Sequence, residues 1–287
     1  MHATKTIAIV TLASAALAAC ATVDQTDPNA ASTTPAEPVS EPVVEAPVAT
    51  DPAFFVDWTQ QAMDGRWFIS EHNTPNGHWE SDWRRRNVRA LPNGLNIQMT
   101  SKSPGANEWP WSGGEIQTRR AHSYGEYQVI MRAAEGAGLI GGFFTHTGPY
   151  YGNPHDQIDV TFTGKDPYQV QFNALADSVD VGVMNYPLDF DVSKNFALYS
   201  FIWAPDRITW YVNGEFAHEV SNENVVIPQT PGKLFANLYQ ARNKGWAGQP
   251  DFLEGATATY RCMSYRPLED TSSRTCADAY ESYVTGG

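Results

Sequence analysis

The stretch 155–164 reads HDQIDVTFTG, in which apolar and polar residues alternate. The apolar side chains occupy every second position, at Ile158, Val160 and Phe162. A period of two predicts a β-strand with one packed face and one polar face. Side chains at i, i+2 and i+4 leave a strand on the same side, so we expect Gln157, Asp159 and Thr161 to form one polar row.

Similar alternation recurs along the chain after residue 53, with turn residues between the apolar runs. Two of the turns contain Asn-Gly, at 93–94 and 213–214, a pair that readily takes the positive φ angles of tight hairpins. Short strands with few helical periods between them indicate an all-β sandwich. The predicted strands are 87–91, 95–100, 114–119, 124–133, 141–147, 157–162, 168–174, 196–204, 207–212, 215–220 and 233–239.

The first 52 residues have a different composition. Residues 1–19 combine an early lysine with a short apolar run and small residues, which predicts a secretory signal peptide. The end of this run, Leu-Ala-Ala before Cys20, resembles the lipobox of bacterial lipoproteins, in which the cysteine carries lipid; ordinary cleavage near an incidental cysteine is the alternative. The residue that follows, Ala21, favours the outer membrane by the same resemblance. Residues 20–52 are rich in proline and acids, which predicts an extended tether.

The remaining composition narrows the partners of the folded part. The formal net charge of −13 argues against nucleic acid and anionic lipid, because the chain offers no basic stripe beyond the short run 84–86. Aromatic residues make up 12% of the chain, which suits both a β core and a surface that stacks on sugars. In an exported protein, Cys262 and Cys276 suggest a disulfide that ties the C-terminal tail, 266–287, to the last strand; two free thiols are the alternative.

From 141 to 265 the chain resembles glycoside hydrolase family 16, most closely the bacterial licheninase type. The resemblance rests on FFTHTGP at 143–149, HDQIDVTFTGKD at 155–166, VQFN at 170–173, FALYSFIWAPDRITWYVNGEFAHEV at 196–220 and TPGKLFANLY at 230–239. It implies a concanavalin-like β-jelly-roll sandwich of two curved antiparallel sheets over 53–265. One sheet of such a fold forms a groove for an extended β-glucan.

The resemblance also implies a catalytic pattern, Glu-x-Asp-x-Glu, on the strand described first. One glutamate attacks the anomeric carbon, the other is the acid and base, and the aspartate orients the first. Here the pattern reads Gln157, Asp159 and Thr161, so both glutamate positions are substituted. An amide cannot act as the carboxylate nucleophile, and a threonine hydroxyl is far too weak an acid to protonate a leaving oxygen.

Other positions of the family's groove are partly kept. Expected substrate-binding residues are Glu115, Phe144, His146, His155, Asn237, Tyr239 and Trp246, of which His146, His155 and Tyr239 replace other aromatic residues of the family. The aspartate that binds a structural calcium in many members corresponds to Arg261, so no metal is expected there. No cofactor is expected.

Three hypotheses follow. The first is a surface lipoprotein that binds a polysaccharide without cutting it. The second is a glycosidase or transglycosylase acting on β-glucan with a relocated pair, Asp159 and Glu115. The third is an envelope scaffold that uses the sandwich for protein contacts.

Overall fold

The computed structural model describes residues 52–74, 77–101, 109–252 and 255–284, which all belong to one compact unit, Val48–Gly287. The predicted signal peptide, the lipidation site at Cys20 and nearly all of the predicted tether lie outside these residues. None of the helices within the described ranges is both long enough and apolar enough to cross a membrane.

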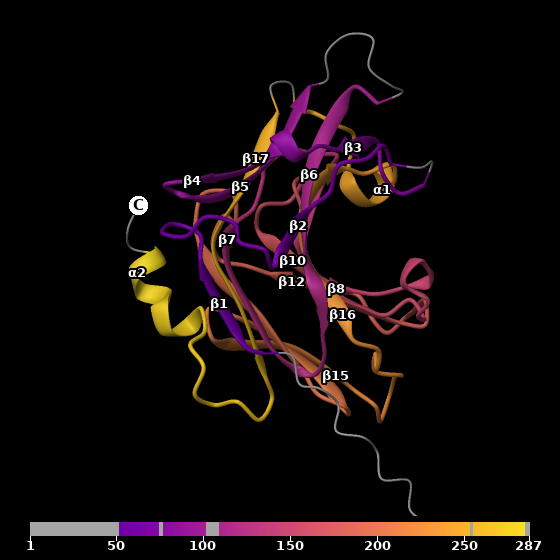
Figure 1. Cartoon of the computed structure of the whole chain (residues 1–287). Helices are drawn as coiled ribbons and strands as arrows, with labels where there is room; N and C mark the ends of the chain where they lie inside the picture. Colours follow the sequence, from indigo (N-terminus) through magenta and orange to yellow (C-terminus); the bar gives the residue numbers. More distant parts are fainter. Residues whose placement is uncertain (1–51, 75–76, 102–108, 253–254, 285–287) are drawn as a thin grey trace, which may run out of the picture. The chain divides into compact units, whose positions relative to one another are not determined.

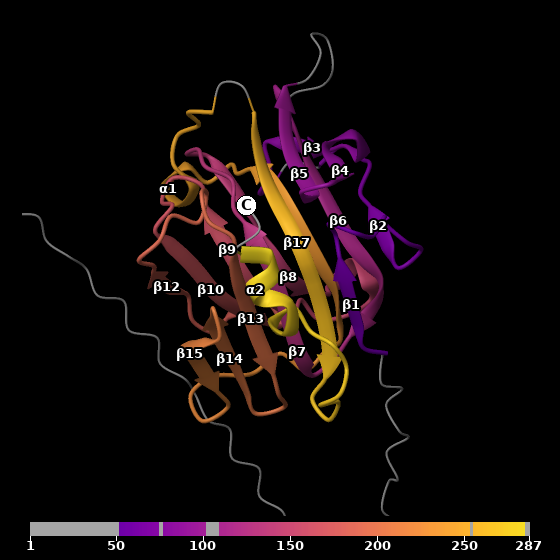
Figure 2. The ribbon, with the colours of Figure 1, turned by 90° about the vertical axis from the view of Figure 1, so that its left-hand side faces the viewer.

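The first of two β-layers is built around β17, whose partners are β7 on one side and β5 and β1 on the other. From β7 the layer continues through β13 and β14 to β15, and β4 pairs with β5 (Figures 1 and 2). Its strands are β1 (Phe54–Asp57), β4 (Val88–Leu91), β5 (Gly94–Ser101), β7 (Gly125–Arg132), β13 (Ala197–Trp203), β14 (Arg207–Val212), β15 (Glu215–Ser221) and β17 (Ala256–Pro267).

The second layer runs in the order β2, β6, β16, β8, β9 and β10, and β11 and β12 both pair with β10. Its strands are β2 (Trp67–Ile69), β6 (Trp111–His122), β8 (Leu139–His146), β9 (Gln157–Thr163), β10 (Gln169–Ala176), β11 (Val179–Asp180), β12 (Met184–Pro187) and β16 (Gly232–Gln240). A short pairing of β6 with β5 joins the two layers into one hydrogen-bonded network, and β3 (Ser81–Trp83) adds to it by pairing with β6.

The core lies between the inner faces of the two layers. The apolar residues of β9 belong to it, and Ile158 and Val160 are fully buried there. Trp210 of β14 is also fully buried; its indole stacks on Phe172 at 5.8 Å and donates a hydrogen bond to the carbonyl of Asp159 at 3.1 Å. The core therefore fixes the backbone of β9 from behind.

The jelly-roll sandwich and each of the predicted strand ranges are confirmed. Among the pairings of the described strands, that of β3 with β6 is parallel. The reason is connectivity: β3 leads through a short 3₁₀ helix, η1 (Arg85–Asn87), into β4, and β4 and β6 are both antiparallel to β5. Of the two predicted Asn-Gly turns, the one at 213–214 has positive φ at both Asn213 and Gly214, and the one at 93–94 has it at Gly94 alone.

The predicted ranges omit β1, β2, β3, β11, β12 and β17. Most of these strands are two to four residues long, which is too short to show a repeated alternation of apolar and polar residues. Gly94 shows a second constraint on the hairpin: a Cβ there would lie 2.4 Å from the carbonyl oxygen of Tyr260 on β17.

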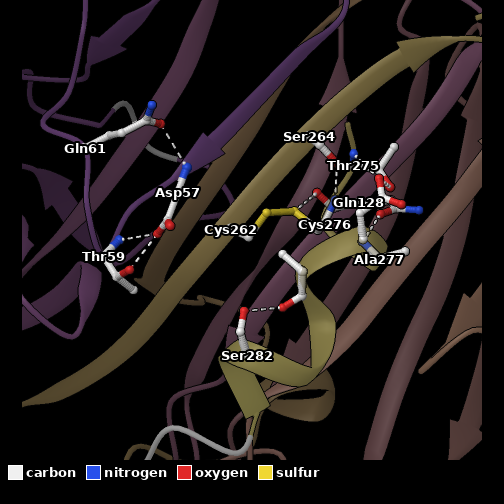
Figure 3. The surroundings of a disulfide bond; sticks show 12 residues. Asp57, Thr59, Gln61, Gln128, Cys262, Ser264, Thr275, Cys276, Ala277 and Ser282 are labelled. Carbon is white, nitrogen blue, oxygen red and sulfur yellow. Dashed lines mark hydrogen bonds between the residues drawn. A yellow bond between two sulfur atoms is a disulfide. The ribbon is translucent and has the colours of Figure 1, made fainter. Parts of the chain in front are cut away.

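The C-terminal segment packs on the outer side of the first layer (Figure 2). It contains η3 (Ala277–Ala279) and α2 (Tyr280–Val284). Cys276 is disulfide-bonded to Cys262 of β17, and the adjacent backbone N–H of Ala277 donates to the side chain of Gln128 (Figure 3). Arg261, the position at which the resemblance implies no calcium, donates to the carbonyl of Tyr283 and lies 3.7 Å from the ring centre of Phe196.

Candidate functional site

The polar row predicted from the alternation lies on the face of the second layer that points away from the core, here called the outer face. Cross-strand partners share a face. Asp159 is opposite Phe144 on β8 and Asn173 on β10, and Phe144 is in turn opposite Phe235 on β16. The register therefore brings residues from well-separated parts of the sequence onto one surface.

Gln157 is at the centre of a hydrogen-bond network. Its amide nitrogen donates to Asp159 Oδ1 at 2.7 Å. Its Oε1 lies 3.2 Å from His146 Nδ1 and 3.3 Å from His155 Nε2, and the two imidazole rings are 5.0 Å apart. These contacts fix the side chain with its neutral amide, and no proton or negative charge is available from it for a displacement reaction.

Asp159 is the one carboxylate of the row and is buried. Burial raises the pKa of its carboxyl to about 7, against the lowering effect of the hydrogen bond from Gln157. Thr161 is half-buried and lies opposite Gly142 and Gln171. At neutral pH the row therefore carries a partly protonated acid between an amide and a hydroxyl.

The two histidines beside Gln157 supply imidazole rings and hydrogen bonds. His146 supplies no charge near neutral pH. Burial and the neighbouring His155 lower the pKa of His146 to about 4, so its imidazole is neutral near pH 7. His146 also contacts Phe235 edge to face at 5.7 Å. A neutral imidazole with a fixed orientation suits recognition of sugar hydroxyls.

Glu115 of β6 is the other buried carboxylate of the outer face. It accepts hydrogen bonds from Ser70 Oγ at 2.7 Å and from the Asn237 amide at 3.4 Å, and burial raises its pKa to about 7. Between β6 and β9 lie β16 and β8, and the register places Glu115 level with Thr161, two residues along the strand from Asp159, so the backbones of the two acids are more than three strand spacings, about 14 Å, apart. The sheet does not place the two acids side by side.

Aromatic side chains accompany the acids. Phe144 stacks on Phe235 at 5.2 Å, and Tyr239 meets the buried Trp83 edge to face at 5.9 Å. Burial, together with the charges of Asp159 and Glu115, raises the pKa of Tyr239. Trp246, from α1 (Lys244–Ala247), donates its indole N–H to Gln171 of β10 at 3.0 Å. Trp246 is thereby held next to the strand that carries Gln171.

The sequence reasoning missed several residues of this face. Lys233 and Phe235 precede Asn237 by four and two positions on β16, and Tyr151 comes from η2 (Pro149–Tyr151). Tyr151 and Lys233 both donate to Gln117 Oε1, each at 3.2 Å. The i, i+2, i+4 alternation that gave the row on β9 would have placed Lys233 and Phe235 beside Asn237.

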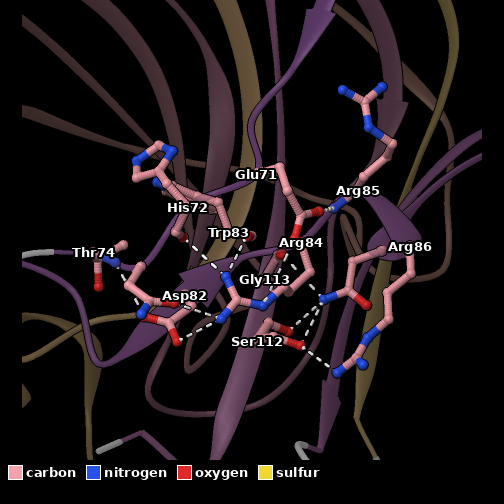
Figure 4. Close-up of polar contacts among 12 residues, drawn as sticks. Glu71, His72, Thr74, Asp82, Trp83, Arg84, Arg85, Arg86, Ser112 and Gly113 are labelled. Atoms are coloured by element: carbon pink, nitrogen blue, oxygen red, sulfur yellow. Dashed lines mark hydrogen bonds and ion pairs between the residues drawn. The ribbon is translucent and has the colours of Figure 1, made fainter. Parts of the chain in front are cut away.

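Asp156, next to the polar row, and the short basic run have structural roles. Asp156 is buried and accepts backbone hydrogen bonds from Asp177, Gln229 and Thr230. Arg84, from the short basic run, is bound to Asp82 and to the carbonyls of His72 and Trp83, so it is not available as a basic stripe (Figure 4). In the described ranges no group of three or more His, Cys, Asp and Glu side chains could hold a metal ion.

A jelly-roll sandwich with a polar and aromatic outer face is an architecture used by proteins that act on carbohydrates. The family model of the glycosyl hydrolases family 16 matches residues 75–258. The chain belongs to this family.

Known proteins similar to this chain include β-glucanases. The β-glucanase of Bacillus subtilis is 32% identical over 226 residues, 74% of this chain and 91% of that protein. The β-glucanase of Acetivibrio thermocellus is 34% identical over 206 residues, 68% of this chain; the match spans only 60% of that longer protein. A solved structure of a β-1,3-1,4-glucanase (lichenase) from a mouse hindgut metagenome has a TM-score of 0.70 at 33% identity, covering 75% of this chain and 99% of that one.

Proposed function

We propose that this protein binds a β-glucan-like polysaccharide on the outer face of the second layer and does not hydrolyse it. The observation that carries the proposal is the network around Gln157. Retaining glycosidases need two carboxyl groups about 5 to 5.5 Å apart, one as nucleophile and one as acid and base. Gln157, Asp159 and Thr161 offer a single carboxyl in that row, and Gln157 is engaged with three side chains.

The remaining side chains favour binding. Sugars present apolar ring faces and many hydroxyl groups, so their sites combine aromatic rings with hydrogen-bonding groups. The outer face has Phe144, Tyr239 and Trp246 for stacking, and Asn237 and the neutral His146 for hydrogen bonds. The β-glucanase relatives support a glucan-like polymer as the occupant.

One observation favours a second candidate, a glycosidase with a relocated pair. Asp159 and Glu115 both have pKa values near 7, a range that suits acid and base catalysis at neutral pH. An inverting pair, however, needs its carboxyl groups about 6.5 to 9.5 Å apart. More than three strand spacings, about 14 Å, separate the two backbones, so the side chains would have to lean towards each other across β16 and β8.

A paired binding and reducing-end assay tests the proposal. The full chain is expected to bind soluble β-glucans in affinity electrophoresis and to release no new reducing ends. The variant Gln157→Glu/Thr161→Glu restores two carboxylates to the row and is expected to gain measurable hydrolysis if a glucan lies across it. Hydrolysis by the unmodified chain that Asp159→Ala abolishes would establish the second candidate instead.

A matched control separates the effect of position from that of charge. Gln60 and Thr257 are both exposed, in the turn after β1 and on β17. The variant Gln60→Glu/Thr257→Glu makes the same chemical change away from the outer face and is expected to leave binding intact and hydrolysis absent. A chain that binds none of the tested glucans contradicts the proposal and leaves the scaffold hypothesis.

We also propose that the protein is a lipoprotein of the cell envelope, anchored in the outer membrane through Cys20. The proposal rests on the sequence of residues 1–20 and on the proline-rich stretch that follows. Mass spectrometry of the N-terminal peptide is expected to find a lipid-modified cysteine, and Cys20→Ser is expected to move the protein out of the membrane fraction. Recovery of an unmodified N-terminus downstream of Cys20 would refute the anchor.

A further inference from the structure

Two cations lie together at one end of the outer face, where β6 and β16 meet η2. Lys233 is half-buried; its Nζ donates to Gln117 Oε1 at 3.2 Å and lies 4.7 Å from the ring centre of Tyr151. Arg119, exposed on β6, has its guanidinium carbon 5.6 Å from the ring centre of Phe68. Phe68 is the cross-strand partner of Gln117, so the two cations flank one patch of the sheet.

Neither cation forms an ion pair within the part of the chain that the structure describes. Among the described residues no carboxylate lies within ion-pair distance of Lys233 or Arg119, although acids exceed bases by 13 in the whole chain. The two charges also act on each other: burial, and after it the charge of Arg119, lowers the pKa of Lys233. Two like charges held close, one of them partly desolvated, cost free energy that a bound anion would offset.

The two buried acids of the outer face repel a bound anion less than two fully ionised carboxylates would. Burial raises the pKa of Glu115 and of Asp159 to about 7, so both are partly neutral near that pH. Charges elsewhere on the acidic surface are screened beyond roughly 8 Å at physiological salt. The local field at Lys233 and Arg119 therefore outweighs the net charge of the chain for a group bound there.

We propose that Lys233 and Arg119, with Tyr151 and Gln117 between them, form a subsite for an anionic substituent of the bound polysaccharide, a carboxylate or a sulfate ester. Lysine presents a point charge with three donors, and arginine presents a planar fork that matches two oxygens. The Tyr151 and Phe68 rings border the subsite and offer apolar faces to the sugar that carries the anion. The inference rests on the proposed function and narrows it to acidic polysaccharides.

Polymers that share one backbone test the inference. The full chain is titrated with unmodified β-glucan, with the same polymer oxidised to carboxylates at C6, and with its sulfated derivative. Binding to at least one charged polymer is expected to be about 10-fold tighter than to the unmodified one, the size of one charge-assisted hydrogen bond. The two charged arms tell which anion fits better.

Charge variants locate the effect. Lys233→Gln/Arg119→Gln is expected to bring the ratio of the affinities for charged and unmodified polymer down to about one, and Lys233→Arg/Arg119→Lys is expected to retain most of that ratio. The control Lys194→Gln/Arg207→Gln removes two exposed cations that are already paired with Glu135 and Asp206, and is expected to keep the preference. Circular dichroism of each variant checks that the sandwich has folded.

The possible outcomes distinguish a failure of this inference from a failure of the proposed function on which it rests. Binding to unmodified β-glucan with no preference for a charged polymer refutes the subsite and leaves the proposed function standing. An equal loss in the control refutes the subsite as well, because the preference would then follow net charge. Binding to none of the three polymers refutes the proposed function itself.

Discussion

The outer sides of the two layers differ in what covers them. On the first layer, Ile130 and Leu198 are covered by the C-terminal segment, in which Cys276, Ala279 and Tyr283 are buried. On the second layer, the outward residues are acids, amides, histidines and aromatic rings, and several of them are only half-buried.

The difference shows which side of the sandwich contributes mainly to stability and which side presents functional groups. The first layer hides apolar side chains under the chain's own residues and secures them with a disulfide (Figure 3). The second layer has two buried carboxyls with raised pKa values and two cations, Lys233 and Arg119, that form no ion pair with a described carboxylate; such groups are costly to hold without a ligand. Changes on the first layer should therefore alter stability but not binding, whereas changes on the second layer should alter binding and, at its buried carboxyls, the pH dependence of stability.

The largest expected effect is on the first layer. Cys262→Ser/Cys276→Ser opens a loop that spans 14 positions of the sequence, and such a loss costs about 3 kcal/mol. The melting temperature is expected to fall by roughly 6 to 12 °C, with glucan affinity unchanged. Calorimetry and affinity electrophoresis measure the two quantities.

Thr271→Ser, at an exposed position inside the same loop, is the control for this change, since it leaves the bond in place. A marked loss of glucan affinity in the double cysteine variant would break the comparison, because the covered side would then contribute to binding.

The next effect concerns Glu115 and depends on pH. Its pKa is about 7 in the folded chain and about 4.3 in an unfolded one, so between these values the folded state holds more protons. The stability that depends on this proton is present below the unfolded pKa and is lost as pH rises through 7. The variant Glu115→Gln cannot titrate, so it lacks this pH-dependent loss of unfolding free energy, which is on the order of 3 kcal/mol. The melting temperature of the variant should therefore fall less between pH 5 and pH 8 than that of the unmodified chain.

Thermal scans at the two pH values measure this difference. Glu223→Gln, at an exposed position after β15, is the matched control and should follow the unmodified chain. Parallel curves for Glu115→Gln and the control would show that burial of Glu115 does not shift its titration.

The smallest expected effect is the loss of glucan affinity when one aromatic ring is removed. Trp246→Ala is expected to weaken affinity for β-glucan about 10-fold, because a stacking face and its fixed orientation are lost. Phe216→Ala removes an exposed ring from β15 of the first layer and should leave affinity unchanged. Equal losses in titrations of the two variants would contradict the assignment of binding to the second layer.

The sequence by itself determined the strands and the sides on which their residues lie. Alternation over 155–164 was enough to place Gln157, Asp159 and Thr161 in one row, because side-chain direction follows from the period of the strand alone. Most of the longer strands were predictable for the same reason, although the 12-residue β17 was omitted. β2, β3 and β11 were too short to show a period.

The tertiary structure decided which residues meet across strands and how deeply they are buried. Lys233 and Gln117 are 116 positions apart, and Ser70 and Glu115 are 45 apart, yet both pairs are hydrogen-bonded. Such contacts depend on sheet order and register, which no local pattern specifies. The pKa values of Glu115 and Asp159 depend on burial in the same way, so the charge of the candidate site is a property of the folded sheet.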